Sequence, residues 1–115
     1  MNLLDTSAVI DRIRDGRATP GAISAMTLVE ILRGVKAEKR AEIKELIEQT
    51  YPVFNLSNDV ILTYCELYDG VKKKGEQLPD ADLLIAATAM ANGLRLETAD
   101  QDFNRLKPYG LRLSD

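Results

Sequence analysis

Residues 79–92, PDADLLIAATAMAN, decide the fold class of this chain. Asp80 and Asp82 form a helix-start signal, and Asn92-Gly93 is a favourable pair for ending a helix. Between these ends the sequence is apolar on nearly every side, which predicts a buried helix. Its small side chains would allow a close approach to a sheet, so we expect a layered fold around it.

Strand and helix signals alternate on both sides of this helix. Such alternation predicts a parallel sheet covered by helices on both faces, the three-layer α/β/α class. The predicted strands are residues 2–4, 22–25, 51–56, 94–98 and 111–113, and the predicted helices are 5–13, 27–34, 36–50, 59–74, 79–92 and 100–106, with a loop at 16–21.

The composition is that of a globular chain, and we expect a single domain over residues 1–115. With 45% apolar residues and four prolines, the chain can bury a core. No apolar run approaches the roughly 20 residues needed to cross a bilayer. The N-terminal segment lacks the basic start and the small-residue cleavage site of a signal peptide. We therefore expect a cytoplasmic protein.

The sequence contains no histidine and one cysteine, which restricts its chemistry. The absence of histidine excludes His-based acid–base catalysis, a Ser-His-Asp triad and every His-containing zinc site. Cys65 lies among apolar residues at helical spacing, so we predict a buried core thiol and not a nucleophile. One cysteine cannot build a zinc site either. Any metal ligands must therefore be oxygens, the ligands that magnesium and manganese prefer.

The net charge of −3 does not indicate a nucleic-acid binder as a whole, but the basic residues are clustered. Such clusters are usually solvated helix faces, which is the default interpretation here. They are also compatible with phosphate contacts. The clusters are Arg12, Arg14 and Arg17; Arg33, Lys36, Lys39 and Arg40; and Lys72, Lys73 and Lys74.

Acidic residues follow several of the predicted strands. In an open parallel α/β sheet, ligands gather beyond the carboxyl ends of the strands. Asp5 follows the first strand directly, Glu30 lies one helical turn after the second, and Asp100 follows strand 94–98. We therefore expect these three acids at one edge of the sheet. Asp82 lies in the first turn of the buried helix, and spacing alone does not place it beside the others.

Each acid also has a simple structural explanation. Aspartate is a favoured N-cap, and acids in a first turn are stabilised by the helix dipole. Either effect would account for Asp5, Asp82 and Asp100. Thr27-x-x-Glu30 is a capping box, in which the Glu30 carboxylate would accept a hydrogen bond from a backbone amide. For one acid taken alone, capping is the better explanation, whereas their joint placement favours a shared site.

Each of the four acids also lies in a short motif. The motifs are Leu3-Leu4-Asp5-Thr6-Ser7; Ile23-Ser24-Ala25-Met26-Thr27-Leu28-Val29-Glu30 followed by Leu32 and Gly34; Asp82-Leu83-Leu84-Ile85-Ala86-Ala87-Thr88-Ala89; and Thr98-Ala99-Asp100-Gln101-Asp102-Phe103. In their order along the whole chain, they resemble the motifs of the PIN-domain nucleases. Within that family the sequence is most similar to the short VapC-type toxins of toxin–antitoxin pairs.

This resemblance implies a sheet of four to five short parallel strands with an acidic metal pocket. It identifies Asp5, Glu30, Asp82 and Asp100 as the catalytic, metal-binding acids. The implied activity is that of a metal-dependent endoribonuclease, the toxin of a type II pair, which hydrolyses RNA phosphodiesters by metal-activated water. The implied cofactor is Mg²⁺ or Mn²⁺, and the implied protein partner is a VapB-like antitoxin.

The same resemblance assigns supporting roles. Thr6 and Thr98 match hydroxyl positions that support the acids. Asp102 is a further supporting residue and an alternative to Asp100 as the fourth acid. Glu97 departs from the family pattern, in which an apolar strand residue is usual; at the end of a strand it could point to solvent.

Further expectations concern partners and rival functions. Arg33, one turn beyond Glu30, is the first choice for a phosphate contact, with a solvated surface position as the equal alternative. The long helix 59–74 carries enough apolar surface for a homodimer. The alternatives are a PIN-domain nuclease of RNA processing, a non-catalytic PIN-like interaction module, and a phosphoaspartyl module centred on Asp5. The last would need a paired acid and a later lysine that the sequence does not offer.

Overall fold

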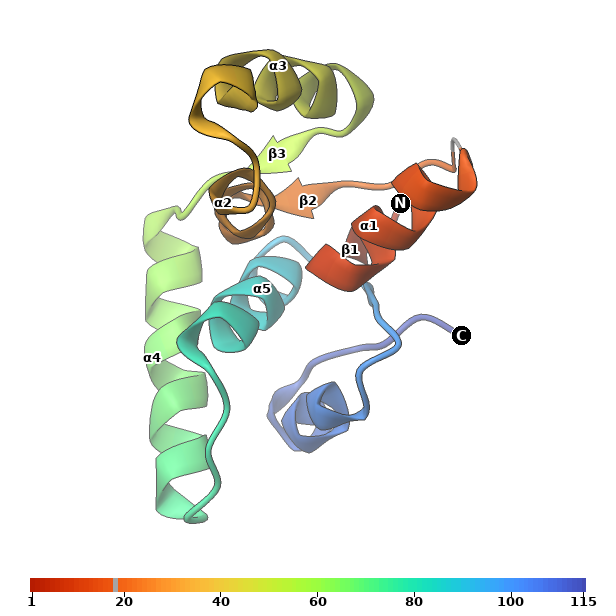
Figure 1. The fold of residues 1–115 in the computed structure, drawn as a ribbon. Helices are drawn as coiled ribbons and strands as arrows, with labels where there is room; N and C mark the ends of the chain where they lie inside the picture. Colours follow the sequence, from red (N-terminus) through yellow and green to blue (C-terminus); the bar gives the residue numbers. More distant parts are fainter. Residues whose placement is uncertain (18) are drawn as a thin grey trace.

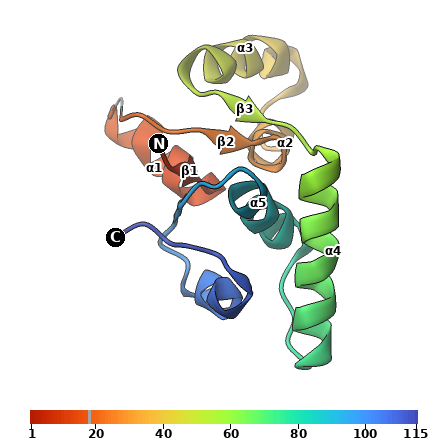
Figure 2. The same cartoon turned by 180° about the vertical axis from the view of Figure 1, so that it is seen from behind.

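The computed structural model describes residues 1–17 and 19–115. Helices alternate with short strands, as the sequence predicts (Figures 1 and 2). The elements in chain order are β1 (Leu3–Leu4), α1 (Thr6–Asp15), β2 (Ile23–Ser24), α2 (Ala25–Arg33), the 3₁₀-helix η1 (Ala37–Lys39), α3 (Arg40–Thr50), β3 (Val53–Phe54), α4 (Asn58–Lys73), α5 (Asp80–Ala91), β4 (Leu96–Glu97) and the 3₁₀-helix η2 (Gln101–Tyr109).

The described strands pair in parallel. β1 pairs with β4, and β2 pairs with β3. Single parallel bridges between Leu3 and Ala22 and between Leu96 and Leu113 join these pairs and add a fifth segment. The resulting order, β3-β2-β1-β4-Leu113, confirms the predicted parallel α/β class, although the strands are shorter than the sequence suggests.

The two residues of β1 show how the layers form. Successive side chains of a strand point to opposite faces of the sheet, and Leu3 and Leu4 are both fully buried. Leu4 belongs to a core with Val9 of α1, Leu28 of α2 and Ile47 of α3. Leu3 belongs to a second core with residues of α4, α5 and η2. The sheet is therefore covered on both faces.

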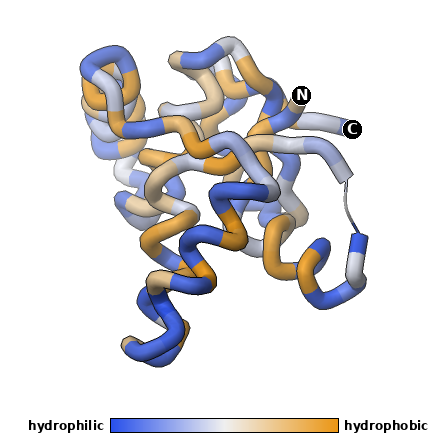
Figure 3. Tube along the Cα trace, turned by 90° about the horizontal axis from the view of Figure 1, so that it is seen from above, coloured by the Kyte–Doolittle hydropathy of each residue, from blue (hydrophilic) through white to orange (hydrophobic). Residues whose placement is uncertain are grey.

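Helix α5 is buried, as its sequence predicts. Ala86, Ala87 and Ala89 have no exposed surface, and α4 packs along this helix (Figure 1). The other helices change repeatedly between hydrophobic and hydrophilic residues along their turns (Figure 3), as expected for helices with one buried side. Among the helices of the described residues, none has both the length and the apolar character that crossing a membrane requires.

Helix α2 begins earlier than predicted. The sequence suggests a start at Thr27, but the helix begins at Ala25 because Ser24 is its N-cap. The Ser24 hydroxyl accepts a hydrogen bond from the Thr27 amide at 3.0 Å. The predicted capping box is therefore wrong. In that box the Thr27 amide would donate to Glu30, but in the structure it donates to Ser24.

Two more helices differ from expectation in their form. The predicted helix 36–50 is divided into η1 and α3. The predicted short helix 100–106 is a longer 3₁₀-helix, η2, which ends at Tyr109. The predicted loop 16–21 includes Ala18, which lies outside the described residues.

The prediction that Cys65 is buried is wrong. Its thiol lies on the exposed side of α4, the side that also exposes Ile61 and Leu62. Leu67 and Val71 lie on the buried side of the same helix. Because both sides of α4 carry apolar residues, hydropathy alone does not indicate which one faces the core.

Candidate active site

Asp5 joins the first helix to the sheet. It directly follows β1, is 5% exposed, and caps the N-terminus of α1. Its Oδ1 accepts hydrogen bonds from the Ala8 amide and from the Ser7 hydroxyl, each at 2.9 Å. Its Oδ2 accepts a hydrogen bond from the hydroxyl of Thr98, just beyond β4. Asp5 is therefore a cap, as one interpretation predicts, and is also oriented by a residue from a distant segment.

Glu30 is held by a side chain of another helix. Thr6 Oγ1, in the first turn of α1, donates to Glu30 Oε1 at 2.6 Å. The same hydroxyl lies 3.2 Å from Thr27 Oγ1, which belongs to the turn of α2 before Glu30. The hydrogen bond from Thr6 fixes the orientation of the Glu30 carboxylate. Thr6, for which the family resemblance implies a supporting role, therefore contacts Glu30 directly.

Asp82 is the acid whose ionisation the site changes most. It lies in the first turn of α5, a helix that has no side-chain N-cap hydrogen bond. Burial is the largest cause that raises the pKa of the Asp82 carboxyl to about 6. The negative charges of Asp100, Glu30 and Asp5 act in the same direction. Asp82 is therefore close enough to these three acids, and to Asp102, for their charges to disfavour its ionised form.

Asp80 is turned to a different partner, although it is only two residues from Asp82. Its Oδ1 accepts a hydrogen bond of 2.6 Å from the Tyr64 hydroxyl of α4. This hydrogen bond is the main cause that raises the pKa of Tyr64 to about 12. Asp80 thus ties α5 to α4 at the helix–helix contact.

Asp100 and Asp102 also differ in their surroundings. Asp100 caps η2 by accepting from the Asp102 amide at 2.9 Å. The Asp100 amide in turn donates to Thr98 Oγ1 at 3.0 Å, so Thr98 contacts both this acid and Asp5. The Asp102 carboxylate lies 3.7 Å from Arg105, with half of its side chain exposed. These contacts favour Asp100 as the fourth acid.

The four acids line a common pocket of about 480 Å³. Asp5 comes from the end of β1, Glu30 from α2, Asp82 from α5 and Asp100 from the segment after β4. The other lining residues are Thr6, Ser7, Ile10, Ile85, Ala99 and Phe103. The structure thus brings together the four acids that the sequence singles out, including Asp82, which spacing could not place.

The acids line the pocket without forming a closed cage. Within residues 1–17 and 19–115, no three acidic or cysteine side chains lie close enough together to form a group that could hold a metal ion. The donor set, which consists of oxygens alone, fits a hard divalent cation.

Arg33 lies at the border of this acidic site. Its Nη2 is 3.8 Å from Glu30 Oε2, and 71% of its side chain is exposed. A contact of this length at an exposed arginine contributes little free energy. Glu30 therefore holds the Arg33 guanidinium only weakly.

The sequence analysis did not predict two contacts near the pocket. Ser7 contacts Asp5 directly, although its place beside a predicted N-cap could have indicated this. Glu97 does not point freely to solvent; it forms an ion pair with Arg12 of α1. No local signal predicts that pair, because its members are 85 positions apart.

Comparisons with known proteins identify the family of this chain. The sequence profile of the PIN domain matches residues 3–107. The chain belongs to the PIN domain family, whose VapC-type nucleases generally depend on a divalent metal ion. It is 32% identical over 117 aligned residues to Ribonuclease VapC1 of Methanocaldococcus jannaschii, an alignment that covers 98% of this chain and 86% of that protein.

Solved structures of toxin–antitoxin complexes share the fold. One is VapBC2 from Rickettsia felis bound to a DNA fragment from their promoter, with a TM-score of 0.81 and 24% identity over 98% of this chain and 96% of that chain. Another is a toxin–antitoxin complex from Klebsiella pneumoniae, with a TM-score of 0.69 and 27% identity over 90% of each chain. The family and the fold expected from the sequence motifs are confirmed.

Proposed function

We propose that this chain is a divalent-metal-dependent endoribonuclease of the VapC type, the toxin of a toxin–antitoxin pair. The observation that carries the proposal is the shared pocket of Asp5, Glu30, Asp82 and Asp100. Capping does not explain all of it, since Glu30 is bonded to Thr6 and α5 has no side-chain cap. The relative named Ribonuclease VapC1 supports the same activity. We place the protein in the cytoplasm and treat residues 1–115 as a single PIN domain.

The cofactor we propose is Mg²⁺ or Mn²⁺, which Asp5, Glu30, Asp82 and Asp100 would hold. When bound, such an ion polarises a phosphodiester and lowers the pKa of a water molecule. The raised pKa of Asp82 reflects mutual repulsion and burial, both of which a cation would offset. The unfavourable electrostatic free energy of the clustered carboxylates would therefore be present only while no cation is bound.

Neighbouring residues of the chain orient the proposed metal-binding carboxylates. Thr98, Ser7 and the Ala8 amide hold the Asp5 carboxylate at both of its oxygens. Thr6 holds Glu30. Arg33, exposed beside Glu30, is the proposed contact for an RNA phosphate. Asp102 takes a supporting role, because its amide fixes the Asp100 carboxylate.

We propose a VapB-like antitoxin as the protein partner. The solved relatives described as toxin–antitoxin complexes support this assignment. An apolar groove of about 560 Å³ between α1 and α3 suits an apolar partner segment, and Arg14 and Arg17 at its border favour acidic residues in that segment. Ile10 lines both this groove and the acidic pocket. The groove and the acidic pocket therefore adjoin at Ile10.

We also propose that the exposed side of α4 forms a homodimer contact. Ile61, Leu62 and Tyr68 of this helix are each more than 40% exposed. Burial of such side chains between two copies would be favourable. Sedimentation of the purified chain would test this point separately from the nuclease activity.

The nuclease proposal is tested by incubating the purified protein with single-stranded and hairpin RNAs in Mg²⁺, Mn²⁺ or EDTA. We expect cleavage in the metals and none in EDTA, with 5′-phosphate and 3′-hydroxyl ends from direct attack by water. Asp82→Asn, with an unchanged circular dichroism spectrum, is the inactive control. Cleavage that persists in EDTA, or products with 2′,3′-cyclic phosphates, would contradict the proposal.

A further inference from the structure

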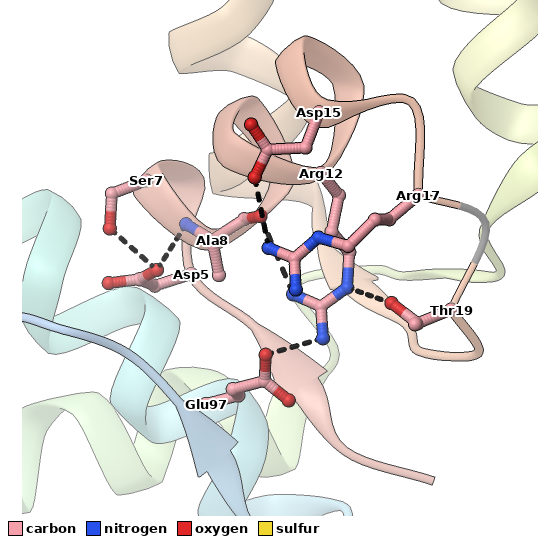
Figure 4. A network of polar contacts seen from close by, with 8 residues as sticks. All are labelled: Asp5, Ser7, Ala8, Arg12, Asp15, Arg17, Thr19 and Glu97. Atoms are coloured by element: carbon pink, nitrogen blue, oxygen red, sulfur yellow. Dashed lines mark hydrogen bonds and ion pairs between the residues drawn. The ribbon is translucent and has the colours of Figure 1, made fainter.

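The ion pair between Arg12 and Glu97 lies beside the proposed metal pocket and is not explained by it. Arg12, in the second half of α1, is 7% exposed. Its guanidinium Nη2 contacts Glu97 Oε2 of β4, and its Nε donates to Thr19 Oγ1 (Figure 4). Nη1 also lies 3.5 Å from the Ala8 carbonyl oxygen. All three nitrogens of this buried guanidinium are thus engaged by protein oxygens.

The pair is the second of two attachments between α1 and β4. The first is at the N-terminus of the helix, where the Asp5 amide donates to the Glu97 carbonyl at 3.1 Å and Thr98 donates to the Asp5 carboxylate. Arg12 is seven residues further along α1 than Asp5, or about 10 Å along the helix axis, and its side chain reaches back past the Ala8 carbonyl to Glu97, so two separated residues of the helix attach to the same residue of β4. A helix held at one end can pivot, whereas a helix held at two separated points keeps its direction.

The direction of α1 matters because of Asp5. The Oδ1 of this residue is bonded to the first turn of α1, and its Oδ2 is bonded to Thr98 after β4 (Figure 4 shows the α1 side). A tilt of α1 against β4 would pull these two sets of contacts apart. The orientation of the Asp5 carboxylate in the pocket therefore depends on how α1 is fixed to the strand.

Stability alone is a poor explanation of the pair. The Arg12 side chain is 9% exposed and the Glu97 side chain is 34% exposed, so desolvation of the arginine and solvent screening of the glutamate both reduce the net free energy of the pair. Strands of a parallel sheet covered on both faces favour apolar residues. A glutamate at this position is therefore better explained by a specific geometric role than by its contribution to the core.

We propose that Arg12 and Glu97 are positioning residues, which fix α1 against β4 so that Asp5 and Thr98 keep the geometry needed to bind a divalent cation. This inference rests on the proposed function for its consequence, but the positioning itself does not require a bound metal ion. Loss of supporting contacts around metal ligands typically weakens metal binding by about 10- to 100-fold. We expect an effect at the lower end of this range, since neither residue bonds to the Asp5 side chain.

The test compares Glu97→Ala with Asp11→Ala. Asp11 pairs with Arg14 on the same helix without reaching the sheet, so it is a matched control. The titrant is Mn²⁺ alone, with free Mn²⁺ followed by electron paramagnetic resonance. We expect Glu97→Ala to weaken Mn²⁺ binding about tenfold and Asp11→Ala to leave it within about twofold of the unmodified chain. Equal affinities for the two variants, or a lower melting temperature of Glu97→Ala without a change in affinity, would overturn the proposal.

Glu97→Gln separates positioning from charge. The glutamine oxygen can still accept from Arg12, so we expect most of the Mn²⁺ affinity to return. If Glu97→Gln is as weak as Glu97→Ala, the effect is a charge effect and the positioning role is wrong. Should Glu97→Ala fail to melt cooperatively, Arg12→Lys replaces it, because lysine keeps the charge but cannot reproduce the three-way contact. We expect this variant also to weaken binding several-fold, and unchanged affinity would count against the proposal.

A metal-free measurement separates this proposal from the nuclease function. The Ala8 amide is bonded to Asp5 Oδ1, so its hydrogen exchange reports on the geometry of the cap. We expect faster exchange of this amide in Glu97→Ala than in Asp11→Ala, without any added metal. If the unmodified chain binds no Mn²⁺ and cuts no RNA, the proposed function fails, while the Ala8 exchange still decides whether the pair positions Asp5.

Discussion

Thr6 Oγ1 donates a 2.6 Å hydrogen bond to Glu30 Oε1, which links the first turn of α1 to the middle of α2. The two residues are 24 positions apart, and each belongs to a separate motif of the family pattern. The bond holds one carboxylate oxygen of Glu30 beside the pocket. One side of the proposed binding site is therefore formed by residues of both α1 and α2.

Thr6→Val should weaken the proposed metal site without damage to the fold. Valine keeps the shape of the side chain but removes the hydroxyl donor, so Glu30 loses its fixed orientation. We expect Mn²⁺ affinity to fall by about 10-fold, the usual effect of losing such a supporting contact. Thr50→Val, which removes only a hydroxyl bonded to its own helix, is the control. Equal Mn²⁺ binding by both variants would show that Thr6 does not support the site.

Asp82→Asn should stabilise the metal-free protein at neutral pH. The pKa of Asp82 is raised from 3.8 in the unfolded chain to about 6 in the folded one. The folded state therefore binds a proton more readily, and this group lowers stability progressively as pH rises through 6. Below the unfolded pKa the penalty is absent. A neutral asparagine carries no such penalty at any pH.

Melting temperatures of the metal-free unmodified chain and of Asp82→Asn at pH 5 and pH 7 measure this effect. After an allowance for solvent screening of the half-buried side chain, we expect a gain of about 1 kcal/mol at pH 7, or roughly 4 °C in Tm. The gain should be smaller at pH 5. A Tm difference that is the same at both pH values would mean that Asp82 is not under electrostatic strain.

Tyr64 and Asp80 should prove to be structural. Their hydrogen bond raises the pKa of Tyr64 to about 12, and Asp80 does not line the acidic pocket. We expect Asp80→Asn to lower the pKa of this tyrosine toward 10, as followed by ultraviolet absorption, with RNA cleavage unchanged. Asp82→Asn should abolish cleavage and leave the Tyr64 titration unaltered. Loss of cleavage in Asp80→Asn would move Asp80 into the site.

The sequence could predict the acids of the site because each belongs to a local motif, and three of them follow strands. Asp82 was located by family resemblance alone, since it enters the pocket from a helix and not from a strand end. The predicted start of α2 is wrong because serine and threonine are both favourable N-cap residues. The sequence alone does not show that Ser24 and not Thr27 takes this position. The Arg12–Glu97 pair could not be predicted, because contacts between distant segments leave no periodic trace in one sequence.

Asp5 poses the sharpest question, since it is both an N-cap and a proposed metal ligand. Asparagine and alanine separate these roles. Asparagine caps helices as well as aspartate does, whereas alanine loses the cap at a cost of about 1 kcal/mol. Only aspartate supplies the negative charge that a divalent cation requires. If Asp5 is a ligand, both variants should lose RNA cleavage by on the order of 100-fold or more, which reflects the several kcal/mol that a metal ion can supply to a transition state.

The stabilities of the two variants should differ in the opposite way. We expect Asp5→Asn to melt close to the unmodified chain and Asp5→Ala to melt a few degrees lower, as measured by circular dichroism without metal. Asp59→Asn, at an exposed first-turn acid of α4, controls for the loss of one negative charge. If Asp5→Asn still cleaves RNA like this control, Asp5 is a cap alone. Any metal ion in the pocket would then have to be held by Glu30, Asp82 and Asp100 without Asp5.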